Sequence, residues 1–443
     1  MSEVSIRFDE KKGPIGPINA VNNGPVPRGR HTGGNVDSYA AAEFPYARTH
    51  DANILYNYGG PHIVDITAVF PDFSADENDP GSYDFFLTDR YLKTIREAGT
   101  KIFYRLGQSI EHWPKKYGIL PPRDFNKWAR IAEHLIRHYT EGWADGFTWD
   151  VEYWEIWNEP DLYPDDAPID KKSTWGGTEK EFHDFYEIAA KHLKGLFPHL
   201  KIGGPGLAWR KDWAERFLTE MKKRNVPIDF FSWHVYPKTP DYVGKLCTFF
   251  RELLDRTGYA DSESILNEWN YVRDFEENWY YSIDAEAGLK GASFAAAVLS
   301  VAAASPVDML MYYDARPGAM NGFFEPFILT RLRKTYFPYV DLAVMKRAGE
   351  RVASESDDPD VYALAVSGEN GSHVLLTYFN DDDSSPEKSI TLRLPLSEKK
   401  TVDCFLTDDE ANEKKTMSFT AGPGEALILL PAKLYSVWHI VVH

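Results

Sequence analysis

Residues 151–159 read Val-Glu-Tyr-Trp-Glu-Ile-Trp-Asn-Glu, and Pro160 follows them. The run is apolar and aromatic until it ends in an Asn-Glu pair, which is typical of a buried strand that carries polar side chains to its carboxyl end. A second run, Ser264–Trp269, has the same character and places Glu268 directly after Asn267. We therefore expect two buried strands that each deliver a carboxylate.

Strand-like and helical runs alternate between about residue 17 and residue 343. The eight expected strands are Pro17–Val21, Phe44–His50, Lys101–Gly107, Val151–Trp157, Leu200–Gly204, Ile228–Tyr236, Ser264–Trp269 and Val307–Tyr313. The expected helices are Asp84–Ala98, Phe125–Tyr139, Thr178–Leu196, Asp212–Arg224, Asp241–Arg256 and Ala285–Ala304, the third of them with a capping box at Thr178 and Glu181. A strand followed by a helix, repeated to eight, predicts an α/β fold of the (β/α)8 TIM barrel type.

The chain changes character after about residue 344. Short alternating runs separated by turn clusters predict a small C-terminal antiparallel β-sandwich domain. The clearest runs are Val361–Ser367, His373–Tyr378, Ser389–Leu394, Thr401–Leu406 and Ala426–Leu430. We assign residues 14–343 to the barrel and residues 344–443 to the sandwich, which residues 1–13 join through a strand at Val4–Phe8. The acidic run Asp381–Asp383 is interpreted as a solvated turn.

The bulk composition excludes some classes of partner. A net charge of −18 over 443 residues argues against nucleic acid, whose phosphates would repel the chain. The longest uncharged run, Gly291–Val307, has 17 residues, which is short for a membrane span. The first residues lack the basic and apolar regions of a signal peptide, so we expect a cytoplasmic protein, or a secreted one whose leader was removed. The oligomeric state stays open, with a homo-oligomer as one alternative.

Polar side chains at the carboxyl ends of barrel strands converge on one pocket. Those expected there are His50, Asn158, Glu159, His234, Tyr236 and Glu268. Two carboxyl groups in one pocket can hydrolyse a glycoside, because a protonated one donates to the leaving oxygen and an ionised one attacks the anomeric carbon. We expect Glu159 to be the acid/base and Glu268 to be the nucleophile.

Each of these residues alone has a plainer explanation, as a solvated glutamate or a hydrogen-bonded structural histidine. The coincidence of two Asn-Glu pairs, each ending an aromatic-rich strand, favours catalysis. Hydrolysis by two carboxyl groups needs no cofactor. The sequence has no evident metal-ligand spacing and no phosphate-binding glycine loop in the right context.

Five motifs together resemble a known family. Trp154–Pro160 resembles the acid/base motif of clan A glycoside hydrolases, and four more segments resemble glycoside hydrolase family 39, which contains β-xylosidases and α-L-iduronidase. These four segments are Pro17–Gly24, Ala47–Asp51, Phe231–Pro237 and Leu266–Trp269. The resemblance covers nearly the whole chain. It implies a retaining mechanism and contacts from His50, Asn158, His234 and Tyr236 to the sugar in the −1 subsite, with Asn158 on the 2-hydroxyl and Tyr236 on the nucleophile.

The resemblance also implies sugar contacts for His31 and for Glu325, in the segment Asn321–Glu325. The substrate expected first is a neutral β-D-xyloside. Other family-39-like sugars stay open: an α-L-arabinoside, a β-galactoside or β-glucoside, an α-L-iduronide, or an exopolysaccharide. An iduronide would require a cation beside its carboxylate, for which Arg48 and Arg316 are candidates. A non-catalytic carbohydrate-binding barrel is the alternative from another class, and it would usually have lost one of the two glutamates.

Overall fold

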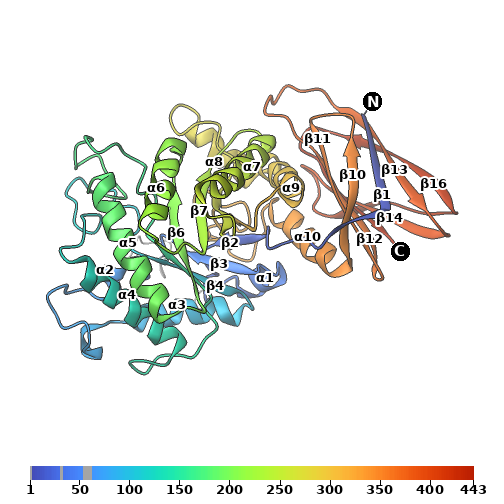
Figure 1. The fold of residues 1–443 in the computed structure, drawn as a ribbon. Coiled ribbons are helices and arrows are strands. Elements are labelled where there is room, and N and C mark those ends of the chain that lie inside the picture. The colour runs from blue at the N-terminus through green and yellow to red at the C-terminus, as the bar shows by residue number, and fades with distance from the viewer. Residues whose placement is uncertain (1, 30–32, 53–61) are drawn as a thin grey trace.

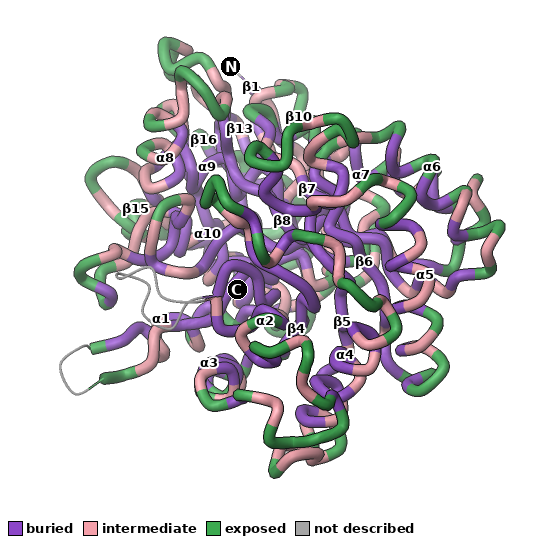
Figure 2. Tube along the Cα trace, turned by 90° about the vertical axis from the view of Figure 1, so that its left-hand side faces the viewer, coloured by how far each residue is buried: buried purple, intermediate pink, exposed green. Residues whose placement is uncertain are grey.

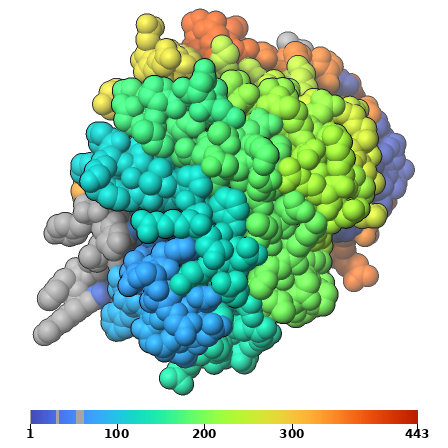
Figure 3. Space-filling view, turned by 60° about the vertical axis from the view of Figure 1, so that its left-hand side comes forward, coloured from blue at the N-terminus to red at the C-terminus, as the bar shows by residue number. Residues whose placement is uncertain are grey.

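The computed structural model describes residues 2–29, 33–52 and 62–443. It has two parts, a closed barrel surrounded by helices and a separate β-sheet that contains both chain ends (Figure 1). The face drawn in Figure 3 is formed mainly by segments coloured blue to yellow-green, and orange segments of the C-terminal part are visible at its rim.

Eight strands, each hydrogen-bonded in parallel to its neighbours, close into the barrel. They are β2 (Ala20–Asn22), β3 (Tyr46–Thr49), β4 (Lys101–Leu106), β5 (Tyr153–Ile156), β6 (Lys201–Leu207), β7 (Phe230–Val235), β8 (Glu263–Trp269) and β9 (Met309–Tyr312). The predicted TIM barrel is therefore confirmed. The strand positions agree with the sequence pattern to within a few residues, because runs of buried residues bounded by turn residues are distinctive.

Helices follow most of the barrel strands. They are α1 (Val36–Ala41), α2 (Ile66–Val69), α3 (Phe86–Glu97), α4 (Phe125–Thr140), α5 (Glu179–Leu196), α6 (Lys211–Lys223), α7 (Pro240–Thr257), α8 (Trp279–Ala287), α9 (Leu289–Ala303) and α10 (Tyr336–Ala348), with a 3₁₀ turn at Pro80–Ser82. The expected capping box at Thr178 and Glu181 is present. The helix expected over residues 285–304 is present as α9, but it begins at Leu289, because Gly288 adopts an extended conformation that separates α8 from α9.

None of the helices in the described part of the chain is by itself long and apolar enough to cross a bilayer. The pair α8 and α9 reaches the required length only together, with a bend of 78° between them.

The second part is a nine-stranded sheet in the order β15-β14-β17-β12-β11-β10-β1-β13-β16. Its strands are β1 (Ser2–Gly13), β10 (Glu350–Ser356), β11 (Val361–Gly368), β12 (Gly371–Tyr378), β13 (Lys388–Leu396), β14 (Lys400–Thr407), β15 (Lys414–Ala421), β16 (Gly424–Ala432) and β17 (Val437–Val442). The expectation of a purely antiparallel sheet is wrong, because β1 inserts between β10 and β13 and runs parallel to β13. Val402 and Ile428, from opposite ends of the strand order, share one hydrophobic cluster, which favours the expected sandwich.

Helix α9 joins the two parts by packing against β11 and β12 (Figure 1). The turn Asp381–Asp383 lies at this junction. Asp382 and Asp383 are exposed, as expected for a solvated turn, but Asp381 and Asp383 also contact residues of the barrel part. Asp381 accepts a hydrogen bond from the Tyr271 hydroxyl at 2.5 Å. Asp383 lies 3.0 Å from the Lys290 ammonium.

The barrel interior is layered. Its floor is an apolar cluster of inward-facing side chains: Ala20, Phe103, Tyr153, Phe230, Ile265, Met309 and Met311. Because strand side chains alternate, the inward positions two residues further along carry the next layer, which includes Asn22, Arg48, Arg105, Glu155, Ser232 and Asn267, all buried. The buried strands and the exposed connecting loops are distinct in Figure 2. The sequence thus places a polar layer directly above an apolar floor, towards the carboxyl ends of the strands.

Candidate active site

The Arg48 guanidinium lies at the centre of the polar layer and is fully buried. Its Nη1 donates to Glu268 Oε1, its Nε to Glu155 Oε2 and its Nη2 to Asn158 Oδ1, each at 2.6 Å. A fourth bond runs from Nη1 to Asn22 Oδ1 at 3.1 Å. A buried guanidinium needs such partners because desolvating an unpaired charge is costly. Arg48 therefore connects the ends of β2, β3, β5 and β8.

Glu155 is the structural partner in this network. It is fully buried, and besides Arg48 it accepts hydrogen bonds from the Ser232 hydroxyl at 2.5 Å and from the Asn267 side-chain amide. These three donors satisfy both carboxylate oxygens. Glu155 therefore balances the charge of Arg48 without facing the pocket as a free acid.

Glu268 lies at the end of β8 and receives two strong donors. Arg48 donates to Oε1 at 2.6 Å, and the Tyr236 hydroxyl donates to Oε2 at 2.7 Å. Burial raises the pKa of Tyr236 well above its ordinary value, and the charge of Glu268 adds to the effect, so the phenol keeps its proton. The two donors fix the orientation of a carboxylate at this position.

Glu159 sits on a tight turn after β5. Its φ of 49° and that of Trp157, 75°, lie in the left-handed region, which costs about 1–3 kcal/mol for a non-glycine residue. The turn is held by bonds from Trp157 N to Leu106 O and from Glu159 N to Gly206 O, both 2.8 Å. Gly107 makes room for it, since a Cβ there would lie 2.9 Å from the Trp157 ring. The surrounding structure thus overrides the local conformational preference at Glu159.

Among the residues that the structure describes, the Glu159 carboxyl group pairs with one charged group, His234, whose Nδ1 lies 2.8 Å from Oε1. Burial raises the pKa of Glu159, although His234 opposes this shift. Burial also lowers the pKa of His234, but the charge of Glu268 and the bond to Glu159 outweigh it and raise the pKa overall. Desolvation therefore favours the protonated form of Glu159, as a general acid requires.

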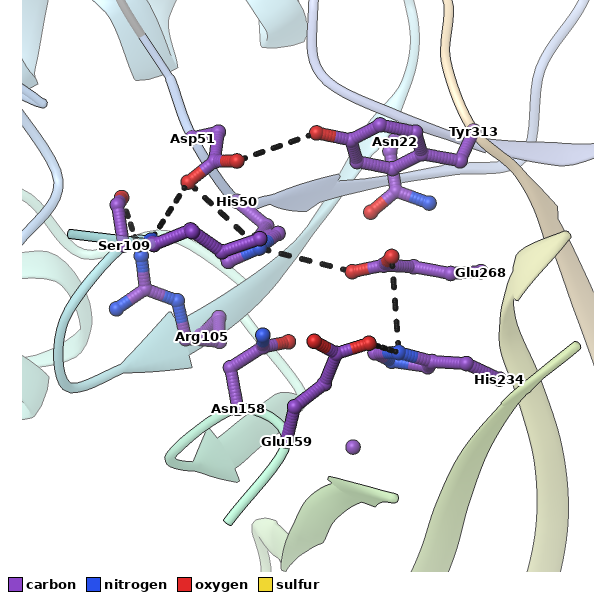
Figure 4. Close-up of polar contacts among 12 residues, drawn as sticks. Asn22, His50, Asp51, Arg105, Ser109, Asn158, Glu159, His234, Glu268 and Tyr313 are labelled. Carbon is purple, nitrogen blue, oxygen red and sulfur yellow. Dashed lines mark hydrogen bonds and ion pairs between the residues drawn. The ribbon is translucent and has the colours of Figure 1, made fainter. Parts of the chain in front are cut away.

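The two carboxyl groups face each other across a short gap (Figure 4). One carboxylate oxygen of Glu159, one of Glu268 and a ring nitrogen of His234 all lie within 4.8 Å of one another. His234 Nδ1 is 3.6 Å from Glu268 Oε2, so the imidazole touches both acids. Three such groups can in principle ligate a cation, but Arg48 and Tyr236 already supply donors to Glu268.

Buried nitrogens without hydrogen-bond partners surround this gap. Within the described residues they include both ring nitrogens of His50, the side-chain amide nitrogen of Asn158 and Nε2 of His234. His50 Nε2 lies 3.7 Å from Glu268 Oε1, and burial lowers the pKa of His50 well below its ordinary value, so its ring is neutral. Unsatisfied buried polar groups are rare in native proteins, and substrate hydroxyls are suitable partners for these.

The remaining expected site residues have different outcomes. His31 lies outside the described residues. Glu325 follows β9 and pairs with Arg333 at 3.5 Å, and its contact with a sugar stays a prediction. Arg48 as a receptor for a substrate carboxylate is wrong, because four protein groups occupy its guanidinium. Arg316 donates to the carboxylate of Asp314 at 3.0 Å and remains 23% exposed.

Sequence reasoning missed the polar layer beneath the two glutamates. Asn22, Arg48 and Glu155 all lie in the quoted motifs, but the sequence analysis gives no role to Asn22 or Glu155 and expects Arg48 only as a partner for a substrate carboxylate. Side chains two residues apart on a strand point to the same side. Arg48 therefore points inward like His50, and Glu155 points inward like Tyr153. Inward-facing charges of opposite sign on neighbouring strands predict a buried ion pair.

Comparison with known proteins gives a consistent picture. Residues 46–255 match the family model described as Glycosyl hydrolases family 39. A β-xylosidase from Geobacillus stearothermophilus is 27% identical over 232 residues, which are 49% of this chain and 42% of the relative. A β-xylosidase from Caldicellulosiruptor saccharolyticus is 32% identical over 178 residues, which are 36% of this chain and 33% of the relative. The matched regions thus span less than half the length of these curated relatives.

Solved structures share the fold over the whole chain. A glucosidase from Croceicoccus marinus has a TM-score of 0.79 at 22% identity, covering 100% of this chain and 99% of that one. Glu159 and His234 lie within the segment that matches the family, and Glu268 lies beyond it. The resemblance to glycoside hydrolase family 39 that the sequence motifs indicate is therefore confirmed, and it is carried by residues 46–255.

Proposed function

We propose that this chain hydrolyses a glycosidic bond with retention of anomeric configuration, using Glu268 as nucleophile and Glu159 as acid/base. The observation that carries the proposal is the pair of carboxyl groups with oxygens within 4.8 Å and with opposite surroundings. Retaining glycosidases hold their carboxyl groups about 5–5.5 Å apart, whereas inverting ones need about 6.5–9.5 Å to admit a water molecule. The short gap supports the retaining route.

In the first step, Glu159 donates its proton to the leaving oxygen while a carboxylate oxygen of Glu268 bonds to the anomeric carbon, and the glycosidic bond breaks. In the second step, Glu159 accepts a proton from water, whose oxygen attacks the anomeric carbon and releases Glu268 as a carboxylate. Glu268 loses its negative charge in the ester. Arg48 stays neutralised throughout, because Glu155 remains bound to it at 2.6 Å.

The substrate proposed first is a β-D-xyloside whose terminal sugar is removed. Two curated relatives are named β-xylosidases, and the unpartnered nitrogens of His50 and Asn158 suit the hydroxyl groups of a neutral sugar. The other sugars considered above, and a barrel that binds carbohydrate without cutting it, are outcomes that the following experiment distinguishes.

The experiment is a screen of p-nitrophenyl glycosides with the product followed by ¹H NMR before mutarotation. The expected result is turnover of the β-xyloside with β-xylose as the first product. Turnover of another glycoside with retention would keep the mechanism and change the sugar. Inverted product would contradict the mechanism, and binding without turnover of any glycoside would favour the non-catalytic barrel.

A further inference from the structure

A second buried cluster of carboxylate and imidazole groups lies where α10 meets the sheet. Asp341 on α10 is 2.8 Å from Nδ1 of His439 on β17. Glu413, directly before β15, brings a carboxylate oxygen within 4.8 Å of both. Nε2 of His439 is in turn 2.9 Å from Nδ1 of His373 on β12. We call these four residues the interface cluster.

The interface cluster differs in charge from the other acidic site between the two parts. At the Asp381–Asp383 turn, Arg273 and Lys290 both form ion pairs with the acids. Within the described residues, no lysine or arginine forms an ion pair with Asp341 or Glu413. Asp341 and His439 are buried, and Glu413 is partly so. A buried carboxyl group beside a partly buried one, with no neighbouring lysine or arginine, is neutralised either by a proton that the two share or by a bound cation.

The catalytic group shows that short distances alone do not define a cation site. Glu159, His234 and Glu268 satisfy the same 4.8 Å criterion. There, however, the guanidinium of Arg48 donates to Glu268 at 2.6 Å. The interface cluster has the carboxylates and the imidazole without the guanidinium.

We propose that Asp341, Glu413 and His439 bind one divalent transition-metal ion of the Zn²⁺ class. Two carboxylates and one neutral imidazole are a common donor set for such ions, and their charges cancel. Nδ1 of His439 would be the ligand atom, with its Nε2–H donating to His373. Metal-bound histidines commonly donate their other N–H to a neighbouring acceptor in this way, which fixes the tautomer.

The ion would connect helix α10 of the barrel part to β17 and the β14–β15 connection of the sheet. Figure 1 shows α10 between the barrel and the sheet. None of the three ligands contacts the catalytic carboxyl groups. Binding should therefore stabilise the contact between the two parts and leave glycoside turnover unchanged.

The test uses the full chain, stripped with a chelator and then titrated with ZnCl₂ by calorimetry, with metal content measured after desalting. We expect one tightly bound Zn²⁺ and a melting temperature at least about 3 °C higher at 100-fold excess over Kd. Glu413→Gln and His439→Gln should abolish both effects. Glu410→Gln, at an exposed carboxylate on the same connection, is the matched control and should retain them.

Glu159→Gln locates the bound ion, because it removes a ligand atom from the catalytic group only. Zinc binding that survives Glu159→Gln and is lost in Glu413→Gln supports the interface cluster. Two results would overturn the proposal: loss of zinc binding in Glu159→Gln, or a melting temperature of the unmodified chain that responds to neither zinc nor chelator. In either case, a proton shared by Asp341 and Glu413 would neutralise the cluster. Glycoside turnover is measured separately, so either proposal can fail alone.

Discussion

The ends of strands β5 and β8 carry the same side chain in opposite surroundings. Glu268 receives a guanidinium and a phenol, from Arg48 and Tyr236, at 2.6 and 2.7 Å. Glu159 instead pairs with His234, and burial raises the pKa of Glu159. Both glutamates follow an asparagine, so the residue type cannot distinguish them. In the proposed mechanism, the neighbouring side chains decide which glutamate is the acid and which is the nucleophile.

The strongest way to break this comparison is to remove the carboxyl group that accepts hydrogen bonds from Arg48 and Tyr236. Glu268→Gly should lower kcat by roughly 10⁴-fold or more on an aryl glycoside, because no other nucleophile replaces it. Azide should partly restore turnover and give the glycosyl azide of inverted configuration. Glu276→Gly, at an exposed position in the following loop, is the control. Unaltered turnover in Glu268→Gly would exclude this residue as nucleophile.

Removing the acid should have an effect that depends on the leaving group. Glu159→Gln should slow hydrolysis of alkyl glycosides by about 10²–10⁴-fold, since these leaving groups need a proton. Glycosides of dinitrophenol should form the glycosyl-enzyme at nearly the original rate, seen as a burst of phenolate before slow turnover. An equal loss with good and poor leaving groups would contradict the assignment.

Replacing Arg48 tests whether the buried network beneath Glu159 and Glu268 stabilises the fold. Arg48→Met leaves Glu155 buried without its charge partner, which should cost about 3–5 kcal/mol in the free energy of unfolding. Denaturant titration measures this. Arg96→Met breaks a partly exposed pair with Asp150 and should cost at most about 1 kcal/mol. An equal loss of unfolding free energy in the two variants would show that the buried network stabilises the fold no more than an exposed ion pair does.

The phenol on Glu268 can be removed with almost no change in shape. Tyr236→Phe deletes one hydrogen bond to a charged group, which is worth about 1.5–3 kcal/mol, so kcat should fall roughly 10- to 150-fold. Steady-state kinetics and a melting curve separate this effect from unfolding. A fall below threefold would mean that Tyr236 does not position the nucleophile.

The smallest expected effect is a shift in the pH dependence of activity when His234 is replaced. His234 lowers the pKa of Glu159 by its charge and hydrogen bond, against the larger effect of burial. His234→Gln removes the charge, so the pKa of Glu159 should rise further. Because Glu159 must be protonated to act, the basic limb of kcat/KM should move to higher pH. Tyr236→Phe is the control and should leave the limb in place, and a shift to lower pH would contradict the account.

The barrel could be predicted from sequence because its strands are buried on both faces. Buried strands appear as apolar runs, and repetition of strand and helix to eight leaves few other folds. The two glutamates were found because each ends such a run after an asparagine. The parallel pairing of β1 with β13 was not visible, since it joins residues nearly 390 positions apart, such as Ser2 and Ile390.

The polar layer was missed for a different reason. Arg48 and Glu155 carry charges that composition alone assigns to a surface, and only their shared inward orientation reveals that they pair inside the barrel. The acids at the junction of the two parts were missed similarly. The ion pairs of Asp381 and Asp383 could not be predicted, because their partners Arg273 and Lys290 lie about 90–110 residues away along the chain.

The most direct measurement is to trap the covalent intermediate. A 2-deoxy-2-fluoro sugar with a dinitrophenolate leaving group, built on whichever glycoside the chain hydrolyses, slows the second step more than the first. Mass spectrometry of the intact chain and its peptides should show one sugar attached to Glu268. A sugar attached to Glu159, or hydrolysis that proceeds with inversion and leaves no label, would contradict the division of roles between the two glutamates.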